Sequence, residues 1–134
     1  MIAVTGKALS PEEIITATKT SDSGCVATYV GLIRDNNRDK MVEYVEYTDR
    51  GQDSVKILRS IVEEAKKKFP INDMSLVHRT GKLNVGDINL VIAVAAGHRQ
   101  EALAACSFAV DEFKARLPTD KQEKYLDGTT NYAF

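Results

Sequence analysis

The spacing of apolar residues along the chain predicts a mixture of helices and strands. Between residues 55 and 69 the apolar side chains recur every three or four positions, which is typical of a helix with one buried face. The near-continuous apolar run from Leu90 to Val94 instead indicates a strand that is covered on both faces and lies inside a sheet. Ser10 and the proline and glutamates that follow it mark another helix start, because serine can cap a helix and proline suits its first position.

The same reasoning along the whole chain predicts a single α+β domain over residues 1–134. Expected helices cover residues 11–18, 55–69 and about 99–117, and expected strands cover 2–4, 25–33, 41–47, 74–78 and 88–95. Residues 34–40 are expected to form a polar loop, and residues 81–87 a connection with two glycines. The tail from about residue 119 is polar, and we expect it to be irregular. Because strands are mixed with helices and no internal repeat is visible, the α+β class is indicated.

Composition narrows the functional classes. Of 134 residues, 43% are apolar and 28% are charged, which is ordinary for a folded chain and argues against disorder. The formal net charge of −1 provides no overall basic field for nucleic acid, so any recognition of anions must be local. The sequence shows neither a secretion signal nor an apolar run long enough to span a bilayer, and we therefore expect a cytoplasmic protein. Cys25 and Cys106 stand singly among apolar neighbours, which predicts buried thiols and no metal site.

The turn Gly97-His98-Arg99 at the start of the last predicted helix is a candidate anion-binding corner. The first N–H groups of a helix have no partner within it and carry partial positive charge, to which His98 and Arg99 would add. Each residue also has a plainer interpretation: Arg99 could pair with a surface carboxylate, and His98 could bond to the backbone. His78 closes a predicted strand, where a structural role is favoured over a catalytic one.

Two lysines lie near the other end of the same predicted helix. Lys114 stands at the edge of its apolar face, and Lys121 follows Pro118, which should end the helix and allow the chain to fold back. If Arg34 lies nearby, the cluster would attract a phosphate or carboxylate, and repulsion among its cations would favour a neutral, reactive amine. This combination fits acyl or sulfur transfer that involves an anionic substrate.

The distance along the helix constrains how these residues can act together. Arg99 and Lys114 are fifteen residues apart in the sequence, which corresponds to about 22 Å along one α-helix. That span is too long for both to reach one small ligand. If all the candidates serve one site, His98 and Arg99 must come from a second copy of the chain, so the functional interpretation implies a homodimer with shared pockets.

Six ordered blocks between about residues 24 and 128 carry a more specific signal. They are Val30-Gly31-Leu32-Ile33-Arg34-Asp35-x-Asn37, Val45-Glu46-Tyr47, Ile61-Val62-Glu63-Glu64-Ala65, His78-Arg79-x-Gly81-x-Leu83-x-Val85-Gly86-Asp87, His98-Arg99-x-x-Ala102 and Asp111-x-x-Lys114-x-x-x-Pro118-x-x-Lys121-x-Glu123. In this order they resemble the MoaE family, the large, catalytic subunit of molybdopterin synthase.

The resemblance implies a fold, an activity and partners. The fold is an α/β hammerhead with an additional small antiparallel β subdomain. The activity is sulfur transfer from the C-terminal Gly-Gly thiocarboxylate of a small ubiquitin-like subunit to cyclic pyranopterin monophosphate, which produces the dithiolene of molybdopterin. Family members are homodimers that bind one small subunit per large subunit, giving a heterotetramer. No metal or other cofactor is implied for this step.

The resemblance also implies roles for individual residues. Lys114 matches the essential active-site lysine and Lys121 the second one, while Arg34 matches an arginine that lines the pocket. His98 and Arg99 match a pair that binds the anionic end of the substrate from the neighbouring protomer. This chain departs from the family at Asp120, where an aromatic residue is usual, and we expect this acid to pair with Lys121 or raise its pKa.

Three functions remain open from the sequence. The first is an active sulfurtransferase, and the second is a catalytically weakened relative that acts as a binding or scaffold protein for a ubiquitin-like partner. The third, which assumes no resemblance, is a small module that binds a phosphate ligand at the Gly97-His98-Arg99 corner. Retention of Arg34, His98, Arg99, Lys114 and Lys121 together favours the first. A pure scaffold has no physical need for both lysines.

Overall fold

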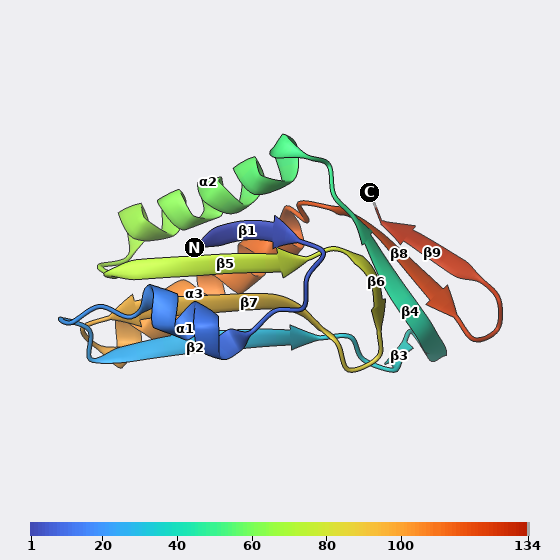
Figure 1. Ribbon diagram of the computed structural model, residues 1–134, viewed down its shortest axis with the longest axis horizontal. Coiled ribbons are helices and arrows are strands. Elements are labelled where there is room, and N and C mark those ends of the chain that lie inside the picture. The colour runs from blue at the N-terminus through green and yellow to red at the C-terminus, as the bar shows by residue number, and fades with distance from the viewer. Residues whose placement is uncertain (134) are drawn as a thin grey trace.

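The computed structural model describes residues 1–133 as helices packed on one sheet, with a second sheet beside it (Figure 1). The helices are α1 (Pro11–Thr18), α2 (Gln52–Lys68) and α3 (Arg99–Ala115). The strands are β1 (Ile2–Thr5), β2 (Cys25–Leu32), β3 (Asn36–Asn37), β4 (Lys40–Thr48), β5 (Asp73–Arg79), β6 (Gly81–Asn84), β7 (Ile88–Ala96), β8 (Asp120–Tyr125) and β9 (Thr130–Ala133). The predicted α+β class is confirmed.

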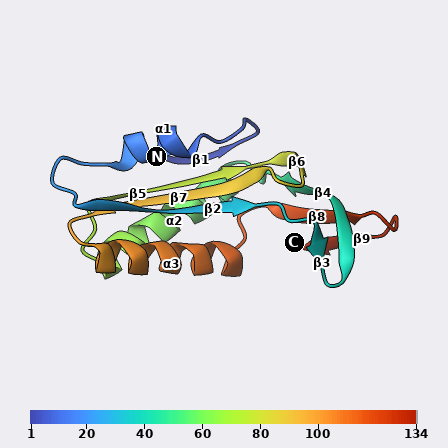
Figure 2. The same ribbon diagram turned by 90° about the horizontal axis from the view of Figure 1, so that it is seen from below.

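The first sheet has the order β1-β5-β7-β2, with β1 parallel to β5 and the other neighbours antiparallel. Figure 2 shows α1 on one side of this sheet and α2 and α3 on the other. Along β7, Leu90, Ile92 and Val94 belong to the core beneath α2 and α3, whereas Val91 and Ala93 belong to the core beneath α1. The prediction that this strand is covered on both faces is therefore confirmed.

The helices begin and pack largely as the sequence predicts. The amide of Glu13 donates a hydrogen bond to the Ser10 side chain at 3.3 Å, so Ser10 caps α1 and Pro11 occupies its first position. In α2 the buried residues recur with helical spacing, and the lysines at 66–68 are exposed at its end. No helix among residues 1–133 is long and apolar enough to cross a membrane. The cytoplasmic location stays a prediction.

The second sheet is where the sequence prediction was wrong. Its strands follow the order β3-β4-β8-β9, and β6 pairs with residues 44–47 of β4 along the edge opposite β8. The supposed loop at 34–40 forms a short hairpin, and the connection at 81–87 contains β6. The tail from residue 119, expected to be irregular, supplies two paired strands, β8 and β9. These strands were missed because residues 120–124 of β8 are all polar and its partner β4 lies some seventy residues earlier in the chain.

The two cysteines are free thiols in different surroundings. Cys106 is buried in the core between α3 and the first sheet, as predicted, and burial raises the pKa of its thiol. Cys25 is only partly buried at the start of β2, where its Sγ lies 3.8 Å from the carbonyl oxygen of Ala96. Both thiols therefore contribute to packing of the first sheet.

Candidate active site

A cleft of about 610 Å³ lies where the end of α3 meets the two sheets, and three of the predicted site residues line it. Arg34 comes from the segment after β2, Lys114 from the last turn of α3, and Lys121 from β8. The fold thus gathers cations that are up to 87 positions apart in the sequence. Their convergence in one cleft was the main expectation for the site.

The three cations differ in their surroundings. Arg34 and Lys114 are exposed, and neither has an ion-pair partner within residues 1–133. Lys121 is partly buried, and its Nζ lies 3.2 Å from Oε1 of Glu123. With three cations and one carboxylate, the cleft carries net positive charge in a protein that is nearly neutral overall.

Glu123 is a further residue of the cleft, to which the sequence analysis assigned no role. It is only 6% exposed, and the amide of Asn37 donates hydrogen bonds to both of its carboxylate oxygens, at 3.1 and 2.9 Å. Burial alone would raise the pKa of Glu123, but the hydrogen bond from Asn37 and the charge of Lys121 hold it below its ordinary value. The carboxylate therefore stays ionised and anchors the Lys121 amine.

The register of β8 explains this pairing and corrects the expectation for Asp120. Tyr47 of β4 lies opposite Lys121, and Val45 lies opposite Glu123, so alternate residues of both strands line the cleft. Asp120 precedes Lys121 directly and must point to the other face of the strand. There it forms an ion pair with Arg50 at 2.8 Å instead of pairing with Lys121.

One wall of the cleft rests on a buried, neutral histidine. His78 is completely buried, with its ring 4.8 Å from that of Tyr47 and 5.0 Å from that of Phe113, measured between centroids. Its Nδ1 donates to the carbonyl oxygen of Asn89 at 2.8 Å, which leaves Nε2 to accept from the Thr119 hydroxyl at 2.9 Å. Burial lowers the pKa of His78 to about 4, so the ring is uncharged at neutral pH. This environment supports the structural role favoured from the sequence.

Tyr47 and Asn89 add neutral polar groups to the lining of the cleft. The Asn89 amide donates to the Tyr47 hydroxyl at 3.1 Å. Burial raises the pKa of Tyr47 to about 12, so its phenol keeps its proton at neutral pH. The charged chemistry of the cleft is therefore left to its three cations and Glu123.

His98 and Arg99 do not join the cleft of their own chain. Both are exposed at the start of α3, where His98 is the N-cap residue, whereas Lys114 lies in the last turn of that helix. Figure 2 shows that this helix begins at one end of the first sheet and ends beside the second sheet. The structure therefore brings together Arg34, Lys114 and Lys121 but separates them from the basic pair.

The turn that carries the basic pair depends on a close contact between two glycines. The amide of Gly24 donates to the carbonyl oxygen of Ala96 at 2.9 Å, and its Cα faces the backbone of Gly97. A Cβ at position 24 would lie 2.3 Å from the Gly97 carbonyl oxygen, a distance that real Cβ atoms do not show. Gly24, which precedes β2, thus constrains the backbone at Gly97, from which the chain continues to His98 and α3.

Among residues 1–133, the structure contains no group of three or more histidine, cysteine, aspartate or glutamate side chains arranged to hold a metal ion. The chemistry that the cleft offers is capture of an anion, together with amines that can donate or accept a proton.

Known proteins share the sequence pattern and the overall fold of this chain. The family model described as MoaE protein matches residues 4–116, a range that includes Lys114 but ends before Lys121. The molybdopterin synthase catalytic subunit of Pyrococcus abyssi is 38% identical over 117 residues, which cover 87% of this chain and 79% of that protein. The crystal structure of molybdopterin synthase from Staphylococcus aureus superposes with a TM-score of 0.90 at 28% identity, covering 98% of this chain and 95% of that chain.

A more distant structure shows the fold alone. It is a protein–protein complex of subunits 1 and 2 of molybdopterin-converting factor from Helicobacter pylori. Its matching chain has a TM-score of 0.74 and 17% identity, and the match covers 97% of this chain and 88% of that one.

Replacement of Gly24 by alanine is expected to destabilise the protein. The added methyl group must displace the backbone at Gly97, and overpacking of this kind costs about 1–3 kcal/mol. Thermal unfolding should show a lower Tm for Gly24→Ala than for the parent. Gly6→Ala is the matched control, because a Cβ there has no neighbour within 4 Å. An equal Tm for both variants would contradict the close contact.

Replacement of Glu123 by glutamine is expected to change stability in a pH-dependent way. Because the folded-state pKa of Glu123 lies below its ordinary value of 4.5, its stabilising effect is present above about pH 4.5 and is lost as pH falls further. The Tm of Glu123→Gln should be lower than that of the parent at pH 7, by the equivalent of about 1–2 kcal/mol. This difference should shrink below pH 4.5.

The exposed Glu63 provides the control for this experiment. Glu63→Gln should leave the Tm close to that of the parent at every pH tested. A difference for Glu123→Gln that stays constant from pH 7 to pH 3 would show that its carboxylate is not stabilised by its neighbours.

Proposed function

Because this chain belongs to the MoaE family, we propose that it is the catalytic subunit of a molybdopterin synthase. In this function it transfers sulfur from the C-terminal thiocarboxylate of a small ubiquitin-like subunit to cyclic pyranopterin monophosphate, forming the dithiolene of molybdopterin. The observation that carries the proposal is the convergence of Arg34, Lys114 and Lys121 on one cleft. Both reactants carry negative charge, one on the thiocarboxylate and the other on the phosphate, and the cleft is cationic.

The arrangement of the cations suits separate roles. Lys114, exposed and without an ion-pair partner in the described chain, can approach the reacting acyl group. As a cation it would stabilise negative charge that develops on the acyl oxygen, and as a neutral amine it would accept a proton. Lys121, held by Glu123, would act from a fixed position. Arg34 offers a guanidinium, which binds carboxylate or phosphate through paired hydrogen bonds.

The small subunit is the proposed sulfur donor. The Helicobacter pylori structure is a complex of two subunits of molybdopterin-converting factor, and one of its chains shares this fold. The cleft of this chain is about 610 Å³, and Leu32, 60% exposed, stands among its lining residues. An extended Gly-Gly tail has no side chains to obstruct entry into such a cleft, and an exposed leucine offers apolar area to the body of a partner.

We further propose that His98 and Arg99 act in the cleft of a second copy of the chain. Their exposure leaves them accessible to another subunit, and the length of α3 keeps them from their own cleft. The free N–H groups at the start of the helix would assist them in binding the phosphate of the substrate. The active unit is then a homodimer in which each pocket uses both chains.

The central test is formation of molybdopterin by this chain with a thiocarboxylated small subunit and cyclic pyranopterin monophosphate. Lys114→Ala should lower the rate at least about 100-fold, because it removes the group proposed to act on the acyl centre. Lys67→Ala, on the exposed face of α2, is the control and should keep the rate of the parent.

Binding of the small subunit is measured in parallel by calorimetry. Product from the parent with intact partner binding by Lys114→Ala supports the assigned role. A Lys114→Ala variant that forms product at the parent rate would refute it. Partner binding without product from the parent would favour the scaffold function.

Complementation between two inactive variants tests the shared pocket. Lys114→Ala and Arg99→Ala chains, each inactive alone, are co-expressed with different tags so that mixed dimers form. If each pocket uses both chains, one pocket of every mixed dimer is intact, and random pairing should restore about a quarter of the parent activity. If each pocket belongs to one chain, mixing restores nothing.

A further inference from the structure

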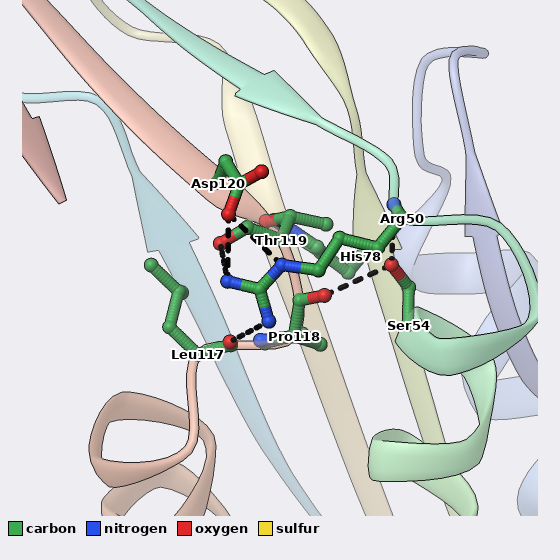
Figure 3. Close-up of polar contacts among 7 residues, drawn as sticks. All are labelled: Arg50, Ser54, His78, Leu117, Pro118, Thr119 and Asp120. Carbon is green, nitrogen blue, oxygen red and sulfur yellow. Dashed lines mark hydrogen bonds and ion pairs between the residues drawn. The ribbon is translucent and has the colours of Figure 1, made fainter. Parts of the chain in front are cut away.

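The short segment Leu117–Asp120, which leads from the end of α3 into the first residue of β8, is held by hydrogen bonds along its whole length (Figure 3). The Arg50 guanidinium donates to the carbonyl oxygens of Leu117 and Thr119, each at 3.4 Å. The Ser54 hydroxyl donates to the carbonyl oxygen of Pro118 at 2.9 Å. Three consecutive carbonyl groups therefore have partners from the junction between β4 and α2.

The side chains of the segment are held as well. One carboxylate oxygen of Asp120, Oδ1, contacts two guanidinium nitrogens of Arg50. It accepts a hydrogen bond from Nε at 2.9 Å and forms an ion pair with Nη2 at 2.8 Å. Thr119, completely buried, donates its hydroxyl to His78 on the opposite side. Arg50 is in turn fixed, because its own amide donates to the Ser54 side chain at 2.9 Å.

This segment of the backbone lies between the two lysines of the cleft. Lys114 precedes it in the last turn of α3, and Lys121 follows it directly in β8. Asp120 and Lys121 are consecutive strand residues, so their side chains point to opposite faces. Holding Asp120 toward Arg50 consequently directs Lys121 into the cleft.

We propose that Arg50 is a positioning residue, which holds the Leu117–Asp120 segment and thereby sets Lys121 in its place relative to Lys114. This inference rests on the proposed function for its effect on catalysis, since Arg50 does not line the cleft. A positioning role for Arg50 also accounts for Asp120, which serves as the anchor for Arg50 and not as a partner of Lys121.

Arginine suits this role better than lysine does. Its planar guanidinium donates in several fixed directions at once, here to a carboxylate and to two carbonyl groups. A lysine at position 50 could keep the ion pair with Asp120 but not the whole set of bonds. Arg50→Lys should therefore recover only part of any activity that Arg50→Gln loses.

The first experiment measures sulfur transfer by Arg50→Gln, Arg50→Lys and Asp120→Asn. Displacement of a catalytic group by about 1 Å can cost up to about 100-fold in rate, and we expect kcat to fall about tenfold in Arg50→Gln, with KM and partner affinity within twofold of the parent. Arg50→Lys should lie between Arg50→Gln and the parent. The double variant Arg50→Gln/Asp120→Asn should be no slower than Arg50→Gln alone, because both changes remove the same link.

Arg59→Gln is the matched control, since Arg59 is an exposed arginine of α2 and the substitution makes the same change in charge. It should keep the kcat of the parent. Arg50→Gln with the parent kcat, or a loss shared equally by Arg59→Gln, would overturn the proposal.

A second measurement does not depend on the enzymatic reaction. Trace acetylation of the folded chain, followed by mass spectrometry, gives the reactivity of Lys121 relative to that of the exposed Lys67. In Arg50→Gln this ratio should change at least about twofold, while it stays constant in Arg59→Gln. If Arg50 only stabilised the fold, Arg50→Gln would instead raise the labelling of all lysines and lower the Tm.

The two measurements separate failure of this inference from failure of the proposed function. If the Lys121 ratio changes in Arg50→Gln while the parent chain makes no product, the positioning role is sustained and the enzymatic function is refuted. An unchanged ratio together with an unchanged kcat would overturn the positioning role alone. If Arg50→Gln does not fold, Asp120→Asn, which removes the charge from the same link, decides between these outcomes.

Discussion

The antiparallel pairing of β8 with β4 is the interaction on which the cleft depends. It joins strands that lie some seventy residues apart and sets Lys121 opposite Tyr47 and Glu123 opposite Val45. A shift of one residue in this register would turn both charged side chains away from the cleft and bring Asp120 in. The pairing is secured at one end by Arg50 and at the other by the buried Tyr125, so register and charge placement are fixed together.

The electrostatics of the cleft follow from this placement. Glu123 is buried, and it remains ionised because Asn37 and Lys121 satisfy it. Lys121 is consequently an anchored cation, whereas Arg34 and Lys114 are exposed to solvent and form no ion pair within the described chain. An anion that enters therefore meets two available cations and one whose position is already set. A buried, uncharged His78 supports the wall behind them without adding charge.

The sequence predicts the first sheet and its helices well, because their apolar periodicity is strong and local. It does not predict β8, whose residues lining the cleft are Lys121 and Glu123, so the usual apolar alternation of a half-buried strand is absent. Motif resemblance names the three cations that the fold gathers. The roles of Arg50, Asn37 and Glu123 depend on contacts between distant segments, and the expected pairing of Asp120 with Lys121 was wrong because consecutive strand residues face opposite ways.

The dimensions of α3 restrict how the length of this chain can vary. Its apolar face packs on β2 and β7, while its last turn delivers Lys114 to the cleft. Deleting one residue would rotate everything beyond it by about 100° and shift it by about 1.5 Å, which would carry the lysine out of the cleft and apolar residues into solvent. Insertions and deletions should therefore be rare between residues 99 and 121. They should accumulate instead at exposed turns such as Asp127–Gly128, since none of the residues described downstream of that turn lines the cleft.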